Sequence, residues 1–90
     1  MSERPSRREI LDGIAAVARE HLGRSRDLTA EDALVADLGL DSIELLTLAA
    51  EVENRFRVAL DPEDDAAIST VGDLADRIEA KLAAAETAGS

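Results

Sequence analysis

A chain of 90 residues with a formal net charge of -10 and a single aromatic residue, Phe56, predicts one small domain built from aliphatic helices. The absence of cysteine excludes disulfides and cysteine-ligated metals, and the acidic charge argues against nucleic acid as a partner. No apolar run approaches the roughly 18 residues of a membrane span, and the start of the chain has no apolar signal segment. We therefore expect a cytoplasmic protein that binds no membrane.

The charge is unevenly distributed along the chain. Residues 1–26 hold six basic and four acidic side chains, a net charge of +2, so residues 27–90 have a net charge of -12. We expect this field to attract partner proteins with basic surfaces. The simpler interpretation is charge that keeps the protein soluble.

The first predicted helix follows Ser6, which forms a capping box with Glu9, and it ends at Gly23. The only histidine, His21, lies on the apolar stripe of this helix. We expect it to be partly buried at the helix end rather than to act as a general base for a distant serine, Ser42, at the start of the second long helix. The stripe at helical spacing consists of Ile10, Leu11, Ile14, Val17, Ala18, His21 and Leu22.

A long connection follows over residues 24–41, beginning at Arg24, whose charge interacts favourably with the dipole of the first helix. Residues 29–32 are expected to form a short helical turn. Gly39 is expected to adopt a backbone conformation that a side chain would hinder. Some of the apolar residues in this connection should fill the space between the first two long helices: Leu28, Leu34, Val35, Leu38 and Leu40.

The second long helix is predicted from Ser42 to Phe56 or Arg57, and its start is the most informative part of the chain. Asp41 is a good N-cap, and Glu44, three residues on, completes a capping box. Ser42 then falls in the first turn, where unpaired N–H groups and the helix dipole favour negative charge. A phosphate ester on the Ser42 oxygen would be stabilised at this place.

This helix has two apolar faces. At about 100° per residue, one stripe is predicted to face the core: Leu45, Leu48, Ala49, Val52 and Phe56. A second strip of Ile43, Leu46 and Ala50 begins beside Ser42, roughly 120° around the helix. We predict that this second strip is an exposed docking surface. Its polar rim would consist of Glu44, Thr47, Glu51, Glu53 and Asn54.

A short third helix is predicted next, capped by Asp61, with Pro62 at its first position and its end near Ile68. Glu63, Asp64 and Asp65 crowd its positive end. This acidic cluster suggests calcium, but it has neither the glycine nor the closing glutamate of an EF-hand loop. We predict no specific metal site, and weak binding of divalent cations stays open.

The last helix is predicted to follow Thr70, which resembles the first residue of a capping box with Asp73. The chain beyond about Ala85 is expected to fray. One narrow apolar stripe faces the core: Val71, Leu74, Ala75, Ile78 and Leu82.

The block Asp37-Leu38-Gly39-Leu40-Asp41-Ser42-Ile43-Glu44-Leu45-Leu46 resembles the attachment motif of acyl carrier proteins. Residues 61–64 and 68–74 resemble the short third helix and the start of the fourth helix of that family, so nearly the whole chain is covered. The resemblance implies an all-α four-helix bundle with three longer helices, a short third one and a long loop between the first two. It also implies one carrier domain over residues 1–90, ordered over about residues 6–85.

The same resemblance implies a function. A 4′-phosphopantetheine group would be attached to Ser42, next to Asp41, through a phosphodiester, and its thiol would hold acyl intermediates as thioesters. The implied partners are a phosphopantetheinyl transferase, an acyltransferase or acyl-ligating enzyme, and ketosynthases or other condensing and tailoring enzymes with basic patches. We expect a monomer that is no enzyme itself. The residues expected to contact partners are Ile43, Glu44, Leu46, Thr47, Ala50 and Glu53.

The sequence leaves the pathway open. Family members often have a dense acidic ridge on the second helix, which Thr47, Asn54, Arg55 and Arg57 dilute here. A polyketide or other secondary pathway is therefore at least as compatible with the chain as fatty acid biosynthesis. An aminoacyl or peptidyl carrier would use the same serine.

Two other functions compete with that of a carrier. A serine hydrolase would need a base and an oxyanion hole near Ser42, and the chain has no G-x-S-x-G motif. An acidic helical adaptor would bind partners through the strip of Ile43, Leu46 and Ala50 without any prosthetic group. Modification of the protein in the presence of coenzyme A and a transferase would separate the adaptor from the carrier.

Overall fold

The computed structural model describes residues 5–24, 27–61 and 67–88, with side chains up to residue 85. Three α-helices lie in this part of the chain, namely α1 (Arg7–Leu22), α2 (Ser42–Phe56) and α4 (Val71–Ala88). The all-α prediction is confirmed. Most of the predicted short third helix and its acidic cluster fall on residues 62–66, outside the described residues. Within the described residues, no helix combines the length and the apolar character that crossing a bilayer requires.

Helix α1 begins and ends where the sequence predicts. The Ser6 hydroxyl oxygen accepts a hydrogen bond from Glu9 N at 3.1 Å, and Glu9 Oε1 accepts one from Ser6 N at 2.8 Å. At the other end, Gly23 is in the left-handed conformation with φ +68°, and its N–H donates to the Ala18 carbonyl. Both ends therefore follow from local sequence.

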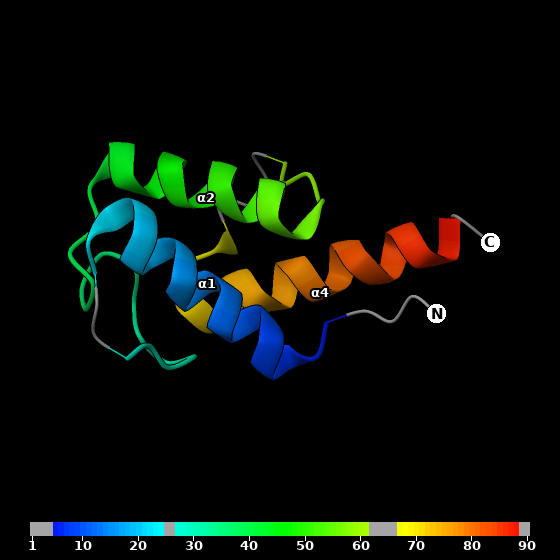
Figure 1. Ribbon diagram of the computed structural model, residues 1–90, viewed down its shortest axis with the longest axis horizontal. Coiled ribbons are helices and arrows are strands. Elements are labelled where there is room, and N and C mark those ends of the chain that lie inside the picture. The colour runs from blue at the N-terminus through cyan, green and yellow to red at the C-terminus, as the bar shows by residue number, and fades with distance from the viewer. Residues whose placement is uncertain (1–4, 25–26, 62–66, 89–90) are drawn as a thin grey trace.

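Helix α1 packs against both α2 and α4 (Figure 1). A Cβ atom at Gly13 would lie 2.4 Å from Phe56 Cζ, so α2 approaches α1 at a point where α1 has no side chain. Residues from all three helices and from the long connection form one core: Ile10, Ile14, Val17, Leu22, Leu34, Leu38, Leu40, Leu48, Val52, Val71, Leu74, Ala75 and Ile78.

The long connection is held by buried leucines, as expected, with one exception. Leu34, Leu38 and Leu40 are 3 to 6% exposed, but Val35 is 60% exposed and does not fill the gap between helices. The helical turn expected over residues 29–32 is a single turn, closed by a hydrogen bond from Asp32 N to the Thr29 carbonyl at 3.1 Å.

The connection also pairs with the start of α4, which the sequence did not predict. Leu34 N donates to the Ser69 carbonyl at 2.9 Å, in an isolated antiparallel bridge between Ala33 and Thr70. Gly72 N donates to the Ala30 carbonyl at 2.8 Å, and a Cβ atom at Gly72 would lie 2.8 Å from that same oxygen. A glycine is therefore required for this close approach.

Helix α4 begins after Thr70 as expected. Asp73 N donates to Thr70 Oγ1 at 3.0 Å and Thr70 N donates to Asp73 Oδ2 at 3.1 Å, which is the geometry of a capping box with aspartate in place of glutamate. The helix continues to Ala88, past the predicted fraying point at Ala85. On its surface, Arg7 Nη1 pairs with Asp76 at 2.7 Å and joins the start of α1 to α4.

Candidate attachment site

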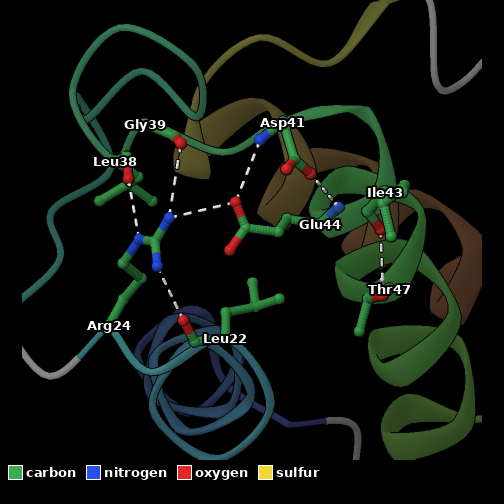
Figure 2. Close-up of polar contacts among 8 residues, drawn as sticks. All are labelled: Leu22, Arg24, Leu38, Gly39, Asp41, Ile43, Glu44 and Thr47. Carbon is green, nitrogen blue, oxygen red and sulfur yellow. Dashed lines mark hydrogen bonds and ion pairs between the residues drawn. The ribbon is translucent and has the colours of Figure 1, made fainter.

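Ser42 is the first residue of α2, and its side chain is exposed. Its neighbour Asp41 is the N-cap: Asp41 Oδ1 accepts from Glu44 N at 2.7 Å, and Glu44 Oε1 accepts from Asp41 N at 3.2 Å (Figure 2). This capping box was predicted. Helix α2 begins at the end of the bundle opposite to the start of α1 and the end of α4 (Figure 1).

The backbone around Ser42 suits a phosphate ester. The first hydrogen bond of α2 runs from Leu45 N to the Asp41 carbonyl at 2.9 Å, and Glu44 N is used by the cap. The N–H groups of Ser42 and Ile43 have no acceptor within the described residues. Two unpaired N–H groups at the positive end of a helix favour an anion on the adjacent hydroxyl, so the site fits the group that the sequence predicts.

An arginine that the sequence analysis placed only by its charge proves to be part of this site. Arg24 Nε donates to the Leu38 carbonyl at 3.0 Å and Nη1 to the Leu22 carbonyl at 2.8 Å. Its Nη2 is 3.1 Å from Glu44 Oε1 and 3.4 Å from the Gly39 carbonyl oxygen. Figure 2 shows the guanidinium between the end of α1 and the turn that leads into α2. The basic residue just after α1 was the available signal, but three of its four partners lie 14 to 20 residues away.

A cavity of about 340 Å³ opens beside the serine, and it too was missed from the sequence. Ser42 is the one polar residue in its lining. Because the other lining residues come from α2, from α4 and from both flanking connections, no local pattern could have shown that they meet. These residues are Leu34, Leu45, Leu46, Leu48, Ala49, Leu60, Ile68 and Leu74.

The two apolar faces of α2 are separated as the helical wheel predicts. Leu48 and Val52 are 2% and 0% exposed, whereas Ile43 and Leu46 are 74% and 68% exposed, and Ala50 is exposed as well. The core stripe is completed by partly buried residues: Leu45, Ala49 and Phe56. The strip of Ile43, Leu46 and Ala50 is therefore accessible to other molecules.

Polar residues of the rim make contacts inside the protein. Thr47 Oγ1 donates to the Ile43 carbonyl at 3.0 Å, one turn back along α2. Glu53 Oε2 accepts from Leu60 N at 2.7 Å and so ties the end of α2 to the following chain. Glu44 has the contacts to Arg24 described above. Each of these side chains thus has a fixed place beside the exposed strip.

The single histidine lies away from the attachment turn. His21 Nε2 is 3.4 Å from Glu51 Oε1, between the last turn of α1 and the middle of α2. Its side chain is 42% exposed, more than its place on the apolar stripe predicts. In the described part of the chain, no group of three or more metal-binding side chains comes together.

A small helical domain that exposes one serine at a capped helix start, beside an apolar cavity, has the arrangement expected of a carrier for a covalently attached group. Comparison with known proteins agrees. Residues 12–78 match the family model described as "Phosphopantetheine attachment site". The chain belongs to this family, the phosphopantetheine-dependent acyl carrier proteins, and is a carrier rather than an enzyme.

Relatives support the same assignment. The acyl carrier protein of Thermotoga maritima is 41% identical over 78 residues, which are 86% of this chain and 96% of the relative. The meromycolate extension acyl carrier protein of Mycolicibacterium aurum is 34% identical over 70 residues, 77% of this chain and 72% of the relative. A solved structure described as "a putative acyl carrier protein" from Mycobacterium tuberculosis is 35% identical and superposes with a TM-score of 0.70, covering 83% of this chain and 96% of that one.

Proposed function

We propose that Ser42 is the residue to which 4′-phosphopantetheine is attached and that the protein delivers acyl thioesters to enzymes of fatty acid, polyketide or related secondary-metabolite biosynthesis. The observation that supports this most is the exposed Ser42 hydroxyl at the capped start of α2, inside the matched residues 12–78. When attached, the group supplies a thiol for thioester formation. The chain itself supplies a hydroxyl, two unpaired N–H groups and a fixed helix start.

The cavity beside Ser42 favours an acyl group over an aminoacyl or peptidyl group. Apart from Ser42, its lining is aliphatic throughout, with side chains such as Leu45, Leu60 and Ile68. Burying an ammonium or amide there without a partner costs several kcal/mol, whereas each buried methylene gains about 0.8 kcal/mol. We therefore propose an aliphatic acyl cargo. Some relatives are named for meromycolate extension, so we propose a pathway that extends acyl chains as one in which this carrier could act.

We propose that partner enzymes dock on the strip of Ile43, Leu46 and Ala50, next to Ser42. The strip is exposed and apolar, and polar side chains stand beside it: Glu44, Thr47 and Glu53. The family implies a phosphopantetheinyl transferase and biosynthetic enzymes as partners. We propose acyltransferases or acyl-ligating enzymes and ketosynthases with basic patches among them, because residues 27–90 have a net charge of -12. We further propose one carrier domain over residues 1–90, working as a cytoplasmic monomer.

The intact mass of the protein tests this function. After incubation with coenzyme A and a broad-specificity transferase, we expect the mass to rise by one phosphopantetheine group. An unchanged mass would contradict the proposal and support the adaptor, which binds partners through the same strip without a prosthetic group.

Loading the arm tests the cargo. An octanoyl thioester should raise the melting temperature above that of the unloaded protein, because its methylenes enter the apolar cavity, whereas a glycyl thioester should leave it unchanged. Equal melting temperatures for both thioesters would contradict an aliphatic cargo.

A further inference from the structure

We propose that Arg24 and Glu44 form a positioning pair that holds Ser42 in the geometry that a phosphopantetheinyl transferase requires. This inference rests on the proposed attachment at Ser42. The Arg24 side chain is 30% exposed and the Glu44 side chain 26% exposed, and their Nη2 and Oε1 atoms are 3.1 Å apart. The pair therefore lies largely within the protein, where a charge-assisted hydrogen bond is stronger than on an open surface.

Arg24 donates to three backbone carbonyls, which lie in two segments of the chain. It donates to the Leu22 carbonyl, which belongs to the last turn of α1, where carbonyl groups have no partner within the helix. It also donates to the carbonyls of Leu38 and Gly39, immediately before the cap of α2. A planar guanidinium offers five donors in fixed directions, so it can serve all three carbonyls and the Glu44 carboxylate, which a lysine ammonium cannot.

Glu44 connects Arg24 to the residue next to Ser42. Its Oε1 atom accepts from Arg24 Nη2 at 3.1 Å and from Asp41 N at 3.2 Å (Figure 2). Asp41 is the N-cap and the neighbour of Ser42. Two contacts through one carboxylate oxygen therefore connect the end of α1 to the residue that precedes the attachment site.

The core holds the same turn independently of this pair. Leu38 and Leu40 are 6% and 3% exposed and anchor the turn from inside. Loss of Arg24 should therefore leave the fold in place while the backbone at Gly39 and Asp41 gains freedom. A misplaced nucleophile lowers the rate of the chemical step, whereas a lost docking contact raises KM. The hydrogen bonds of Arg24 go to the carbonyls of Leu22, Leu38 and Gly39 and to Glu44, so its removal should leave the proposed docking strip exposed.

Four variants test the proposal in transferase kinetics and thermal melts: Arg24→Gln, Glu44→Gln, the double variant, and Arg19→Gln as a control. Glu44→Gln keeps an amide oxygen for the cap while it removes the charge. Arg19→Gln removes the same charge near the end of α1, at an exposed side chain with no ion pair in the described residues. All four use the full chain.

We expect kcat for modification to fall about tenfold in Arg24→Gln, the size of one lost charge-assisted hydrogen bond, with KM nearly unchanged. Glu44→Gln should show a smaller fall in kcat. The double variant should be no slower than Arg24→Gln, because both substitutions break the same connection. Arg19→Gln should behave as the unsubstituted protein.

Several results would overturn the inference. An unchanged kcat in folded Arg24→Gln would do so, as would fully additive losses in the double variant. A rise in KM with unchanged kcat in Glu44→Gln would also do so, because it would mean that Glu44 contacts the transferase instead of positioning Ser42. If Arg24→Gln does not fold, an unchanged kcat in Glu44→Gln refutes the pair. Absence of modification in the unsubstituted protein would instead refute attachment at Ser42.

Discussion

Helices α2 and α4 both begin with a capping box. Asp41 and Glu44 exchange side-chain and backbone hydrogen bonds at the start of α2, and Thr70 and Asp73 do the same at the start of α4. A capping box therefore marks both helix starts equally well, and by itself says nothing about function.

The surroundings of the two helix starts differ. In α4, the N–H groups of Val71 and Gly72 donate to carbonyls of the long connection at 2.9 and 2.8 Å, and Val71 is 0% exposed. In α2, the N–H groups of Ser42 and Ile43 have no acceptor in the described residues, and both side chains are exposed. The start of α4 is thus used by the fold, whereas the start of α2 is available to an attached anion and a partner protein.

The largest expected effect separates the buried and exposed sides of α2 itself. Leu48→Ala should cost about 2 to 5 kcal/mol of unfolding free energy, because it removes burial and leaves a cavity. Leu46→Ala should lower the free energy of unfolding by no more than about 1 kcal/mol. It should nevertheless slow modification by partner enzymes, because the activation free energy of that reaction should rise by about 1 kcal/mol. Thermal melts and transferase rates on both variants check this. If Leu46→Ala unfolds the protein while Leu48→Ala does not, the assignment of the two faces is wrong.

The next effect compares the second residues of the two helices. Gly72→Ala should destabilise the protein by about 1 to 3 kcal/mol, because the new Cβ atom would lie 2.8 Å from the Ala30 carbonyl oxygen. Ile43→Ala, at the matching position of α2, should leave stability within about 0.5 kcal/mol and slow the transferase. Urea denaturation of both variants measures the difference. Equal losses of stability would show that the start of α2 is also part of the packed fold.

The sequence predicts those features of the fold that depend on residues close together in the chain, and it does not predict those that depend on residues far apart in the chain. The capping boxes of Ser6 and Asp41 and the left-handed end at Gly23 involve residues at most five positions apart, and the two faces of α2 follow from the helical repeat of one segment. All were predicted correctly. The pairing of the long connection with Gly72, the exposure of Val35 and the contacts of Arg24 depend on segments that meet only in the folded chain. For that reason the sequence could place Ser42 at the start of α2, but it could not place the arginine and the cavity beside it.

A smaller effect concerns acid. Hydrogen bonds from Ser69 N, Thr70 N and the Ser69 hydroxyl lower the pKa of Asp73 below its ordinary value of 3.8. The folded state therefore binds a proton less readily than the unfolded state. The stabilisation is present above about pH 4 and is lost as the pH falls through the lowered pKa. Urea melts of the unsubstituted protein and Asp73→Asn should show a stability difference at pH 7 that shrinks toward pH 3. A difference independent of pH would contradict this role of the carboxylate.

The smallest expected effect lies in the association of partners with the open start of α2. If the -12 charge of residues 27–90 attracts basic partners, association rates should fall as ionic strength rises, since the Debye length shortens from about 10 Å at 0.1 M to about 3 Å at 1 M salt. Stopped-flow mixing with the transferase at several salt concentrations measures this. Rates that do not respond to salt would mean that the charge serves solubility alone.

The central claim is that, of the three helix starts with a capping box in the described residues, only that of α2 bears the prosthetic group. Peptide mass spectrometry of the modified protein tests it most directly, with Ser42→Ala and Ser69→Ala as a matched pair. Ser69 lies just before the cap of α4, where its hydroxyl is 3.1 Å from Asp73 Oδ2. We expect phosphopantetheine on the peptide that contains Ser42, a folded Ser42→Ala with no mass increase, and full modification of Ser69→Ala. Phosphopantetheine retained by Ser42→Ala, or found on the peptide that contains Ser69, would contradict the claim.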